Sequence, residues 1–305
     1  MKKAYMIMAH DSPEKVNRLV RVLNYNSDFF IHIDKKSDIE LFKRKLCDLE
    51  NVHFCETRVT VNWAGWNQLQ AILIMMNDAV KYDKSYSHLI LMTETDYPIW
   101  SNQEIETYLR GHMETQFIMA YNCTRSPVKT DRNRINHVWW YDWPQWTPFL
   151  HKWIRRIFNR TIFSCIRKRA TCLLSGKRVD VYFGQMLFAV TPKCAEFILR
   201  VYNTDKRFNR YMKTTFAPCE LYYHTILFNS KFRTQTIDGG EEHEITPDFS
   251  WAPLHHYNYA NTPKVYEEGD YDELINCGKP FFRKAIIGVS DSLMNKIDIK
   301  RSEYE

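Results

Sequence analysis

The stretch "KAYMIMAHDSPEKVNRLVRVLNYNSDFFIHID", residues 3–34, holds two apolar runs on either side of an amphipathic segment. The runs "KAYMIMA" and "FFIHI" are short and rich in branched and aromatic residues, which is typical of buried strands. Between them, Val16, Leu19, Val20 and Leu23 recur at helical spacing. A strand, a helix and a second strand in this order predict a parallel pair joined by a helical crossover.

The same alternation continues to residue 121. A capping box, Ser37 to Glu40, predicts the start of the next helix, and Ser101 to Glu104 predicts another. The expected strands then include "VHFCE", "HLILMTETD" and "QFIMAY", with the long helix "WNQLQAILIMMNDAVKY" between the first two. Five strands separated by helices predict an α/β fold with a doubly wound, mostly parallel sheet. Such sheets bind ligands beyond the carboxyl ends of their strands, where the sequence places His10, Asp34, Glu94 and Asp96.

The composition excludes several other classes of protein. Glycine is scarce at 9 residues, and the chain has neither GxGxxG nor GxxxxGK[ST], which removes the main support for dinucleotide and P-loop sites. The 8 cysteines form no CxxC pair, so we expect reduced thiols in a cytoplasmic protein. No stretch approaches the roughly 18 apolar residues of a membrane span, and the N-terminus does not resemble a secretory signal.

One segment makes the chain basic. Between Trp143 and Val179 there are nine Lys and Arg and no acid, whereas the whole chain carries a net charge of +6. Within it, "HKWIRRIFNRTIFSCIRKR" (151–169) has an apolar face opposite a cationic one, which is typical of a helix in a membrane interface. The alternative is that the apolar face packs on the sheet and the cations attract an anionic substrate. The main alternative to an enzyme is a nucleic-acid-binding protein that uses residues 152–178.

The second half of the chain is less regular. Residues 122–180 follow no simple pattern, and then "VYFGQMLFAV" (181–190) predicts a strand and "TPKCAEFILRVYN" predicts a helix capped by Thr191 with Pro192 in its first position. A last helix is expected over 219–229, with Glu220 in its first turn. A carboxylate there gains a few tenths of a kcal/mol from the helix dipole, so the local pattern alone favours a structural role for Glu220.

Two further groups could carry chemistry. Glu94 and Asp96 would share one side of a strand that continues through both residues, and such an acid-x-acid pair could grip Mg²⁺ or Mn²⁺. Arg283 and Lys284 in "FFRKA" are adjacent cations that suit a diphosphate.

Five motifs in order resemble one known family. "IHIDKK", "VNWAGWNQLQAILIMMNDAV", "LMTETDYPI", "APCELYYHTILFNS" and "FFRKA" are similar to motifs of the core-2/I-branching β-1,6-N-acetylglucosaminyltransferases and their peptide O-xylosyltransferase relatives. The resemblance covers roughly residues 3 to 285 and suggests a bacterial-type member. It implies a GT-A-type fold, a UDP-sugar donor and inversion of the anomeric centre.

The resemblance also implies roles for individual residues. Glu220 matches the catalytic base, and Asp34 matches the acid near the uracil. Arg283 and Lys284 match the basic pair that holds the diphosphate. The other donor-binding positions that we expect are His10, Trp63 and Asp96. The turn "TETDYP" departs from the family's usual Ser-x-x-Asp-Tyr-Pro, and 122–180 aligns with nothing, so acceptor recognition is expected there.

These expectations combine into one hypothesis. A single glycosyltransferase domain, 1–305, would divide into a nucleotide-binding half (1–121), a variable insertion (122–180) and an acceptor and catalytic half (181–305). It would transfer a sugar, GlcNAc first and xylose as the alternative, from UDP to a glycan hydroxyl in the synthesis of a bacterial surface polysaccharide. Arg283 and Lys284 would replace a metal cofactor. We expect no nucleic-acid partner, and a cytoplasmic location with docking on an anionic inner membrane face beside a lipid-linked acceptor.

Overall fold

The structure is a computed structural model, and it describes residues 1–142, 153–154, 156–158, 161, 165–244, 251–258 and 263–303. Its centre is a five-stranded sheet in the order β10-β4-β1-β2-β3. β1 pairs in parallel with β2 and β4, β2 pairs in parallel with β3, and β10 is an antiparallel edge. The strands are β1 (Lys3–Ala9), β2 (Ser27–Ile33), β3 (Val52–Phe54), β4 (Leu89–Thr93) and β10 (Ala189–Val190).

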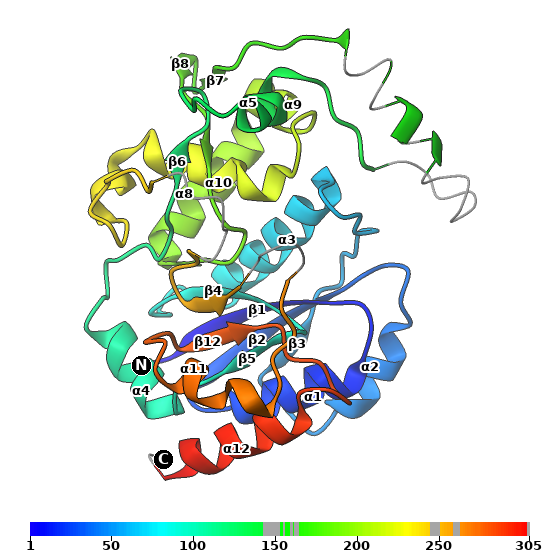
Figure 1. Cartoon of the computed structure of the whole chain (residues 1–305), viewed down its shortest axis with the longest axis vertical. Helices are drawn as coiled ribbons and strands as arrows, with labels where there is room; N and C mark the ends of the chain where they lie inside the picture. The colour runs from blue at the N-terminus through cyan, green and yellow to red at the C-terminus, as the bar shows by residue number, and fades with distance from the viewer. Residues whose placement is uncertain are drawn as a thin grey trace.

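Helices cover both faces of this sheet (Figure 1). Ala4 and Met6 of β1 join a core cluster with α3, whereas the alternating Tyr5 and Ile7 join a second cluster with α1, α2 and α4. Successive side chains of β1 point to opposite faces of the sheet and so belong to two separate cores, as a doubly wound sheet requires. The predicted α/β class is confirmed. The helices are α1 (Pro13–Val22), α2 (Ile39–Lys45), α3 (Trp66–Tyr82), α4 (Asn102–Arg110) and α8 (Pro192–Thr204), which packs on α3.

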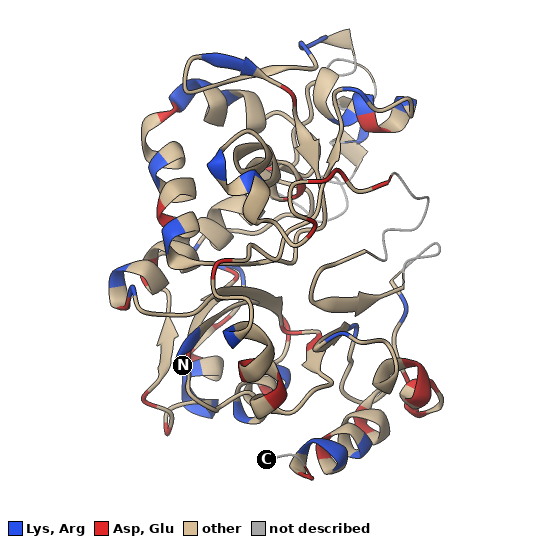
Figure 2. Ribbon diagram, turned by 90° about the vertical axis from the view of Figure 1, so that its left-hand side faces the viewer, with Lys and Arg blue, Asp and Glu red and all other residues tan. Residues whose placement is uncertain are grey.

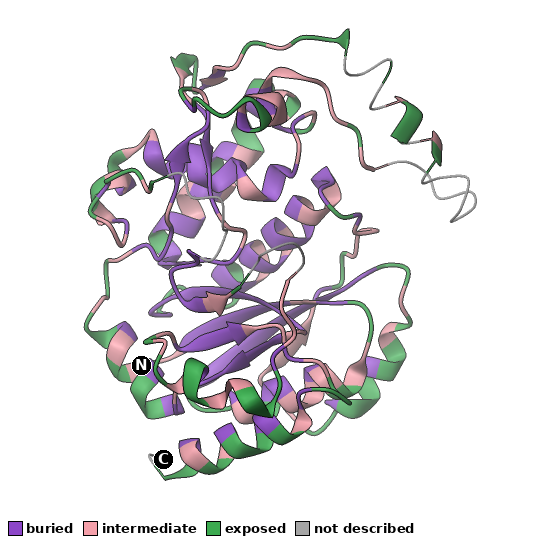
Figure 3. Ribbon diagram, in the orientation of Figure 1, coloured by how far each residue is buried: buried purple, intermediate pink, exposed green. Residues whose placement is uncertain are grey.

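The sheet is the most buried part of the molecule, as Figure 3 shows. Every residue of β2 and β4 is buried. Charged residues instead lie mostly on the helices and loops (Figure 2). Among the described residues, no helix is long and apolar enough to cross a membrane.

The helix starts follow the sequence signals with one exception. Ser101 and Glu104 form the predicted capping box of α4, and Thr191 caps α8 with Pro192 at its start. The predicted box of Ser37 and Glu40 is wrong. Asp38 caps α2 instead, because its carboxylate accepts the N–H of Glu40 at 3.0 Å.

Two strand predictions also need correction. Residues 181–190 form no single strand, since β9 (Tyr182–Phe183) and β10 are separated by five residues and belong to different sheets. The segment 116–121 adds only isolated bridges and the short β6 (Tyr121–Asn122), which pairs with β9. The fifth strand of the main sheet is therefore β10, from much later in the chain.

A small second sheet joins the middle of the chain to its C-terminal region. It has the order β11-β12-β5, with β12 antiparallel to β5 and parallel to β11. Tyr97 of β5 is further tied to α12, because its hydroxyl donates to Asp298 at 2.8 Å. The elements are β5 (Asp96–Pro98), β11 (His255–Tyr257), β12 (Phe281–Arg283), η3 (Glu268–Asp270), α11 (Tyr271–Ile275) and α12 (Asp291–Ser302).

The remaining elements form a lobe above α3 (Figure 1). A hairpin, β7–β8, lies against α9, and α10 packs against β9. Glu220 lies in the short 3-10 turn η1 rather than in the predicted helix over 219–229, which begins only at Tyr222. The lobe comprises α5 (Lys129–Asn136), β7 (Cys172–Leu174), β8 (Lys177–Val179), α9 (Lys206–Met212), η1 (Pro218–Glu220), α10 (Tyr222–Phe228) and η2 (Lys231–Gln235).

Candidate active site

A cavity of about 560 Å³ lies between the lobe, the start of α3 and the small second sheet. Its lining brings together four of the residues singled out from the sequence: Trp63, Glu220, Arg283 and Lys284. They are up to 221 positions apart in the sequence, so only the tertiary structure brings them together.

Glu220 is placed by its backbone. Its carbonyl accepts the N–H of Gly184 at 2.9 Å, and its own N–H donates to Ala217, whose φ is 49°. Gly184 is needed for this approach, because a Cβ there would lie 2.2 Å from the carbonyl oxygen of Met119 and 2.5 Å from the ring of His224. The turn therefore fixes the carboxylate at the cavity wall.

The surroundings of Glu220 change its acidity. Only 28% of its side chain is exposed, and this burial raises its pKa to about 7, although the Arg134 guanidinium opposes the rise. Arg134 Nη1 lies 3.9 Å from Oε2 of Glu220, too far for a hydrogen bond. A carboxylate with a pKa near neutrality is suited to accept a proton from a hydroxyl at physiological pH.

Arg134 is a site residue that sequence reasoning missed. It lies on α5, inside the 122–180 segment that aligned with nothing. Its guanidinium lies over the rings of Phe183 and Phe216, at 4.5 and 5.1 Å from their centroids. These contacts hold the cation at the cavity wall. No short motif could have identified it, since its position depends on contacts with Phe183, Phe216 and Glu220, which are all distant in the sequence.

Trp63 forms an aromatic rim on the cavity. The side chain is 68% exposed and meets Tyr141 and Phe216 edge to face, with centroids 5.8 and 5.6 Å apart. The turn is anchored by Asp142, whose carboxylate accepts the N–H of Asn67 at 3.0 Å. A flat, exposed ring next to a carboxylate is a suitable surface for a sugar ring.

Two adjacent cations, Arg283 and Lys284, also line the cavity. Arg283 is held by Asp96, since Nη1 donates to Oδ1 at 3.0 Å and also to the hydroxyl of Thr93. Lys284 forms no ion pair with a residue that the structure describes. Burial, followed by the neighbouring Arg283 charge, lowers the pKa of Lys284. One cation is thus fixed by a partner while the other is available to an anion.

Asp96 lies behind the cavity rather than in it. Its buried carboxylate accepts the N–H of Thr93 at 2.7 Å through Oδ2, and Nε2 of His255 lies 3.7 Å from the same oxygen. Burial lowers the pKa of His255 to about 4, so that this ring is neutral near pH 7. His255, like Arg134, was not identified from the sequence.

The acid-x-acid geometry expected for Glu94 and Asp96 is wrong. β4 ends at Thr93, and the turn that follows sends the two carboxylates to different partners. Glu94 accepts the backbone N–H groups of His10 and Asp11 at 3.1 and 3.2 Å. Among the described residues, no group of three or more His, Cys, Asp and Glu is arranged to hold a metal.

His10 and Asp34 lie at the carboxyl ends of β1 and β2, as expected, but do not line the cavity. Nδ1 of His10 lies 2.8 Å from Glu94, and this hydrogen bond raises the pKa of His10. Asp34 accepts the N–H of Lys36 at 3.0 Å, and the Lys36 ammonium lies 3.3 Å from its second oxygen. Both remain candidates for the nucleoside end of a donor.

The sequence matches a family model described as "Branch: Core-2/I-Branching enzyme" over residues 3–243. Mouse "Xylosyltransferase 2" is 25% identical over 247 residues, which cover 77% of this chain and 25% of that protein. The bovine "Beta-1,3-galactosyl-O-glycosyl-glycoprotein beta-1,6-N-acetylglucosaminyltransferase" is 23% identical over 233 residues, covering 73% of this chain and 48% of that protein. The chain therefore spans about a quarter to a half of the length of these relatives.

A solved structure of mouse xyloside xylosyltransferase 1, apo form, aligns with 95% of this chain and 99% of its own, at 10% identity and a TM-score of 0.40. The family match, taken with the mostly parallel doubly wound sheet, confirms the GT-A-type fold class expected from the sequence.

Proposed function

Because this chain belongs to the Core-2/I-Branching enzyme family, we propose that it is an inverting glycosyltransferase that moves a sugar from UDP to a hydroxyl of a glycan acceptor. The observation that carries the proposal is the single cavity of about 560 Å³ that Glu220 lines together with Arg283 and Lys284. A proton acceptor and two cations for a leaving diphosphate are the groups that this reaction needs.

The reaction is one displacement at the anomeric carbon. Glu220 takes the proton of the acceptor hydroxyl as its oxygen attacks the carbon, and the bond from that carbon to UDP breaks on the opposite face. The electron pair of the broken bond leaves with UDP, where Arg283 and Lys284 meet the growing negative charge. Glu220 ends protonated and returns its proton to water.

The remaining donor contacts follow from the positions of the strand ends. His10 and Asp34 would hold the nucleoside, with Asp34 near the uracil, and Trp63 would contact the transferred sugar or the acceptor. Arg283 and Lys284 would replace a metal cofactor. The positive charge of Arg134 would favour the ionised form of Glu220, which acts as the base.

The donor that we propose first is UDP-GlcNAc, because the bovine relative is named as an N-acetylglucosaminyltransferase, and the second is UDP-xylose, because mouse "Xylosyltransferase 2" is similar over 77% of this chain. A panel of UDP-sugars tests this without an acceptor, because slow hydrolysis releases UDP from the accepted donor. Hydrolysis of one UDP-sugar that depends on Glu220 is expected. Turnover only with a nucleotide other than UDP would reject the proposal.

We place the enzyme in the cytoplasm, on the inner face of the membrane of a bacterium, where it would extend a lipid-linked glycan for a surface polysaccharide. Much of the 151–169 segment, including Lys152, Arg155 and Arg160, lies outside the described residues. The described Trp153, Ile157 and Ile166 are 53%, 55% and 47% exposed, which supports contact with a membrane interface. The domain boundaries at 121 and 180 stay predictions.

A further inference from the structure

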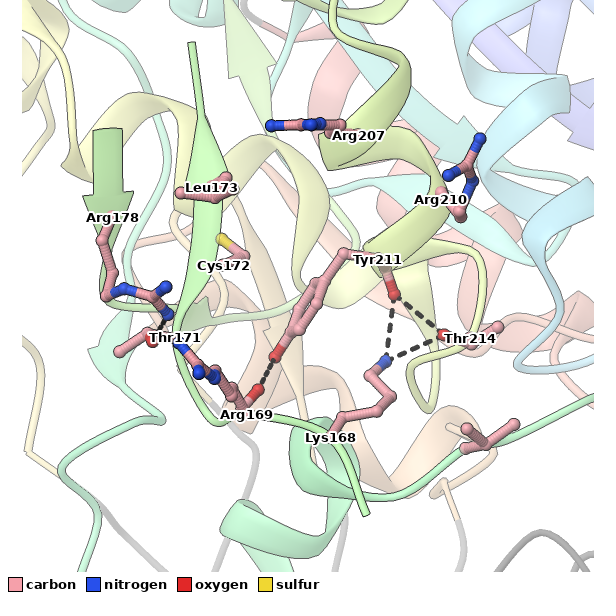
Figure 4. A pocket seen from close by; sticks show the side chains of 11 residues that line it. Lys168, Arg169, Thr171, Cys172, Leu173, Arg178, Arg207, Arg210, Tyr211 and Thr214 are labelled. Carbon is pink, nitrogen blue, oxygen red and sulfur yellow. Dashed lines mark hydrogen bonds between the residues drawn. The ribbon is translucent and has the colours of Figure 1, made fainter. Parts of the chain in front are cut away.

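A second cavity, of about 550 Å³, lies in the lobe between the β7–β8 hairpin and α9. It shares no lining residue with the candidate active site. Figure 4 shows Arg169 and Arg178 beside Thr171 on the hairpin side, and Arg207 on α9. The two sides come from separate segments of the chain.

The walls of this cavity are joined by hydrogen bonds. Asp205, which caps α9, accepts the N–H of Ser175 in the hairpin at 2.7 Å and that of Phe208 at 2.9 Å. The hydroxyl of Tyr211 donates to the carbonyl of Arg169 at 2.9 Å. The space is therefore held in place by the fold rather than left between two loose surfaces.

The lining carries several positive charges and no negative one. Five cations line the cavity, and no acid does: Lys168, Arg169, Arg178, Arg207 and Arg210. The side chains of Arg169, Arg207 and Arg210 form no ion pair or hydrogen bond with any residue in the described part of the chain. Other arginines are paired, for example Arg21 with Asp48 at 2.9 Å and Arg110 with Glu106 at 2.7 Å. An anion that lies among these cations would be attracted to each of them.

Lys168 adds a cation that is only half-exposed. Its ammonium donates to the carbonyl of Tyr211 and to the hydroxyl of Thr214, both at 3.0 Å, and lies 4.2 Å from the Tyr211 ring centroid. Neither acceptor is charged, and burial lowers the pKa of Lys168 to about 7. A bound anion would supply the missing negative charge.

We propose that this cavity is a second binding site, separate from the active site, for the phosphate group of a phosphate ester. Guanidinium groups donate pairs of parallel hydrogen bonds to phosphate oxygens, and the ammonium of Lys168 adds a point charge. Leu173 and the ring of Tyr211 provide apolar surface for the carbon part of the ester. A soluble sugar phosphate and a phospholipid headgroup share this chemistry.

Inorganic pyrophosphate is the probe, measured by calorimetry at low salt. Wild type should bind it at two sites, one in each cavity. R169Q/R207Q changes one exposed cation on each wall and should weaken only the second site, by tenfold or more, while UDP binding and thermal stability stay unchanged. K284A should show the converse, so failure of the proposed active site is distinguished from failure of this one.

K177Q/K206Q is the matched control, because it removes the same charge from one exposed residue of the β7–β8 hairpin and one of α9 that do not line the cavity. It should leave both sites intact. Hydrogen exchange of wild type with pyrophosphate should show protection in 165–178 and 206–214. Equal isotherms for wild type and R169Q/R207Q, or protection confined to the active site, would reject the proposal.

Vesicles separate the two sources of phosphate. If the natural ligand is a headgroup, phosphatidylglycerol vesicles should sediment wild type and K177Q/K206Q but not R207Q/R210Q, which changes two exposed lining cations on α9, outside 151–169; phosphatidylcholine vesicles should sediment none of them. If the ligand is soluble, the pyrophosphate site remains and the three proteins sediment alike. Absence of both the second pyrophosphate site and the variant-dependent sedimentation would overturn the assignment.

Discussion

The guanidinium of Arg283 donates to the carboxylate of Asp96 at 3.0 Å, across the antiparallel pairing of β12 with β5. Asp96 has no exposed side-chain surface, whereas Arg283 retains 19%. The acid thus holds the cation from behind and leaves part of it directed to the cavity. This pair links the small sheet to the proposed diphosphate site.

Asp96→Asn should weaken UDP binding about tenfold or more, because an amide cannot replace the charge-assisted hydrogen bond that orients Arg283. Calorimetry with UDP measures the change. Asp272→Asn, at an exposed position on α11, should bind UDP as wild type does. Unchanged affinity of Asp96→Asn would show that Arg283 is positioned without this carboxylate.

UDP should bind in the presence of a chelator, because Arg283 and Lys284 supply the positive charge for its diphosphate. We expect micromolar affinity, about −6 to −8 kcal/mol by calorimetry. Binding that disappears with chelator and returns with Mn²⁺ would contradict the metal-free mechanism.

Glu220→Gln should keep the affinity for UDP while losing about two to four orders of magnitude in kcat, as expected for a lost general base. Steady-state rates and calorimetry separate the two effects. Glu241→Gln, an exposed acid, is the control. Near-wild-type turnover would leave Glu220 with only a structural role in its turn.

The same residue gives a pH dependence. In wild type, kcat/KM should rise with pH and level off above about 7, where Glu220 loses its proton. Because the folded-state pKa is raised above the ordinary value of 4.5, the folded state loses stability as pH rises from about 4.5 through about 7. Glu220→Gln should therefore melt above wild type at pH 8 and equal to it below pH 4.5. A constant difference across this range would exclude the raised pKa.

Gly184→Ala should destabilise the protein by about 1–3 kcal/mol, because the new methyl group overlaps Met119 and His224. Gly184 also donates to Glu220, so kcat should fall in the same variant. Denaturant unfolding and steady-state rates check both effects. Gly269→Ala meets nothing within 4 Å and should change neither.

Trp153→Ser with Ile157→Ser should reduce sedimentation with anionic vesicles, since both side chains are more than half exposed. UDP binding should not change. Ile299→Ser, at a position 67% exposed on α12, serves as the matched apolar control. If all three proteins sediment equally, the membrane proposal for the 151–169 segment is wrong.

Much of the parallel sheet was predictable because its signals are local. The alternation of apolar strands with amphipathic helices between residues 3 and 93 follows from side-chain periodicity, and Ser101 and Glu104 lie close enough to act as one motif. The sequence predicts 116–121 as the fifth strand, whereas β10 forms the edge of the sheet in the structure. This difference was not predictable, because several short apolar runs could pair with the same edge and tertiary packing decides between them.

In the candidate site too, residues in local motifs were predicted and residues placed by long-range contacts were not. Glu220, Arg283 and Lys284 were identified by motif, and the structure brings them to one cavity. Arg134 and His255 were missed, since neither forms a pattern with its sequence neighbours. Each acquires its position through contacts with residues more than 80 positions away.

The pairing of β12 with β5 also has a consequence for the order in which the protein is made. A nascent chain emerging from the ribosome with 250 residues already contains Trp63, Asp96 and Glu220, but not the cations at 283 and 284. Asp96 stays without its partner Arg283 until β12, a strand about 185 positions downstream, has been synthesised. Contacts of such separation form late. Translation therefore supplies Glu220 before Arg283 and Lys284, so a ribosome-bound chain that has not reached residue 283 lacks both of the cations proposed to bind the diphosphate.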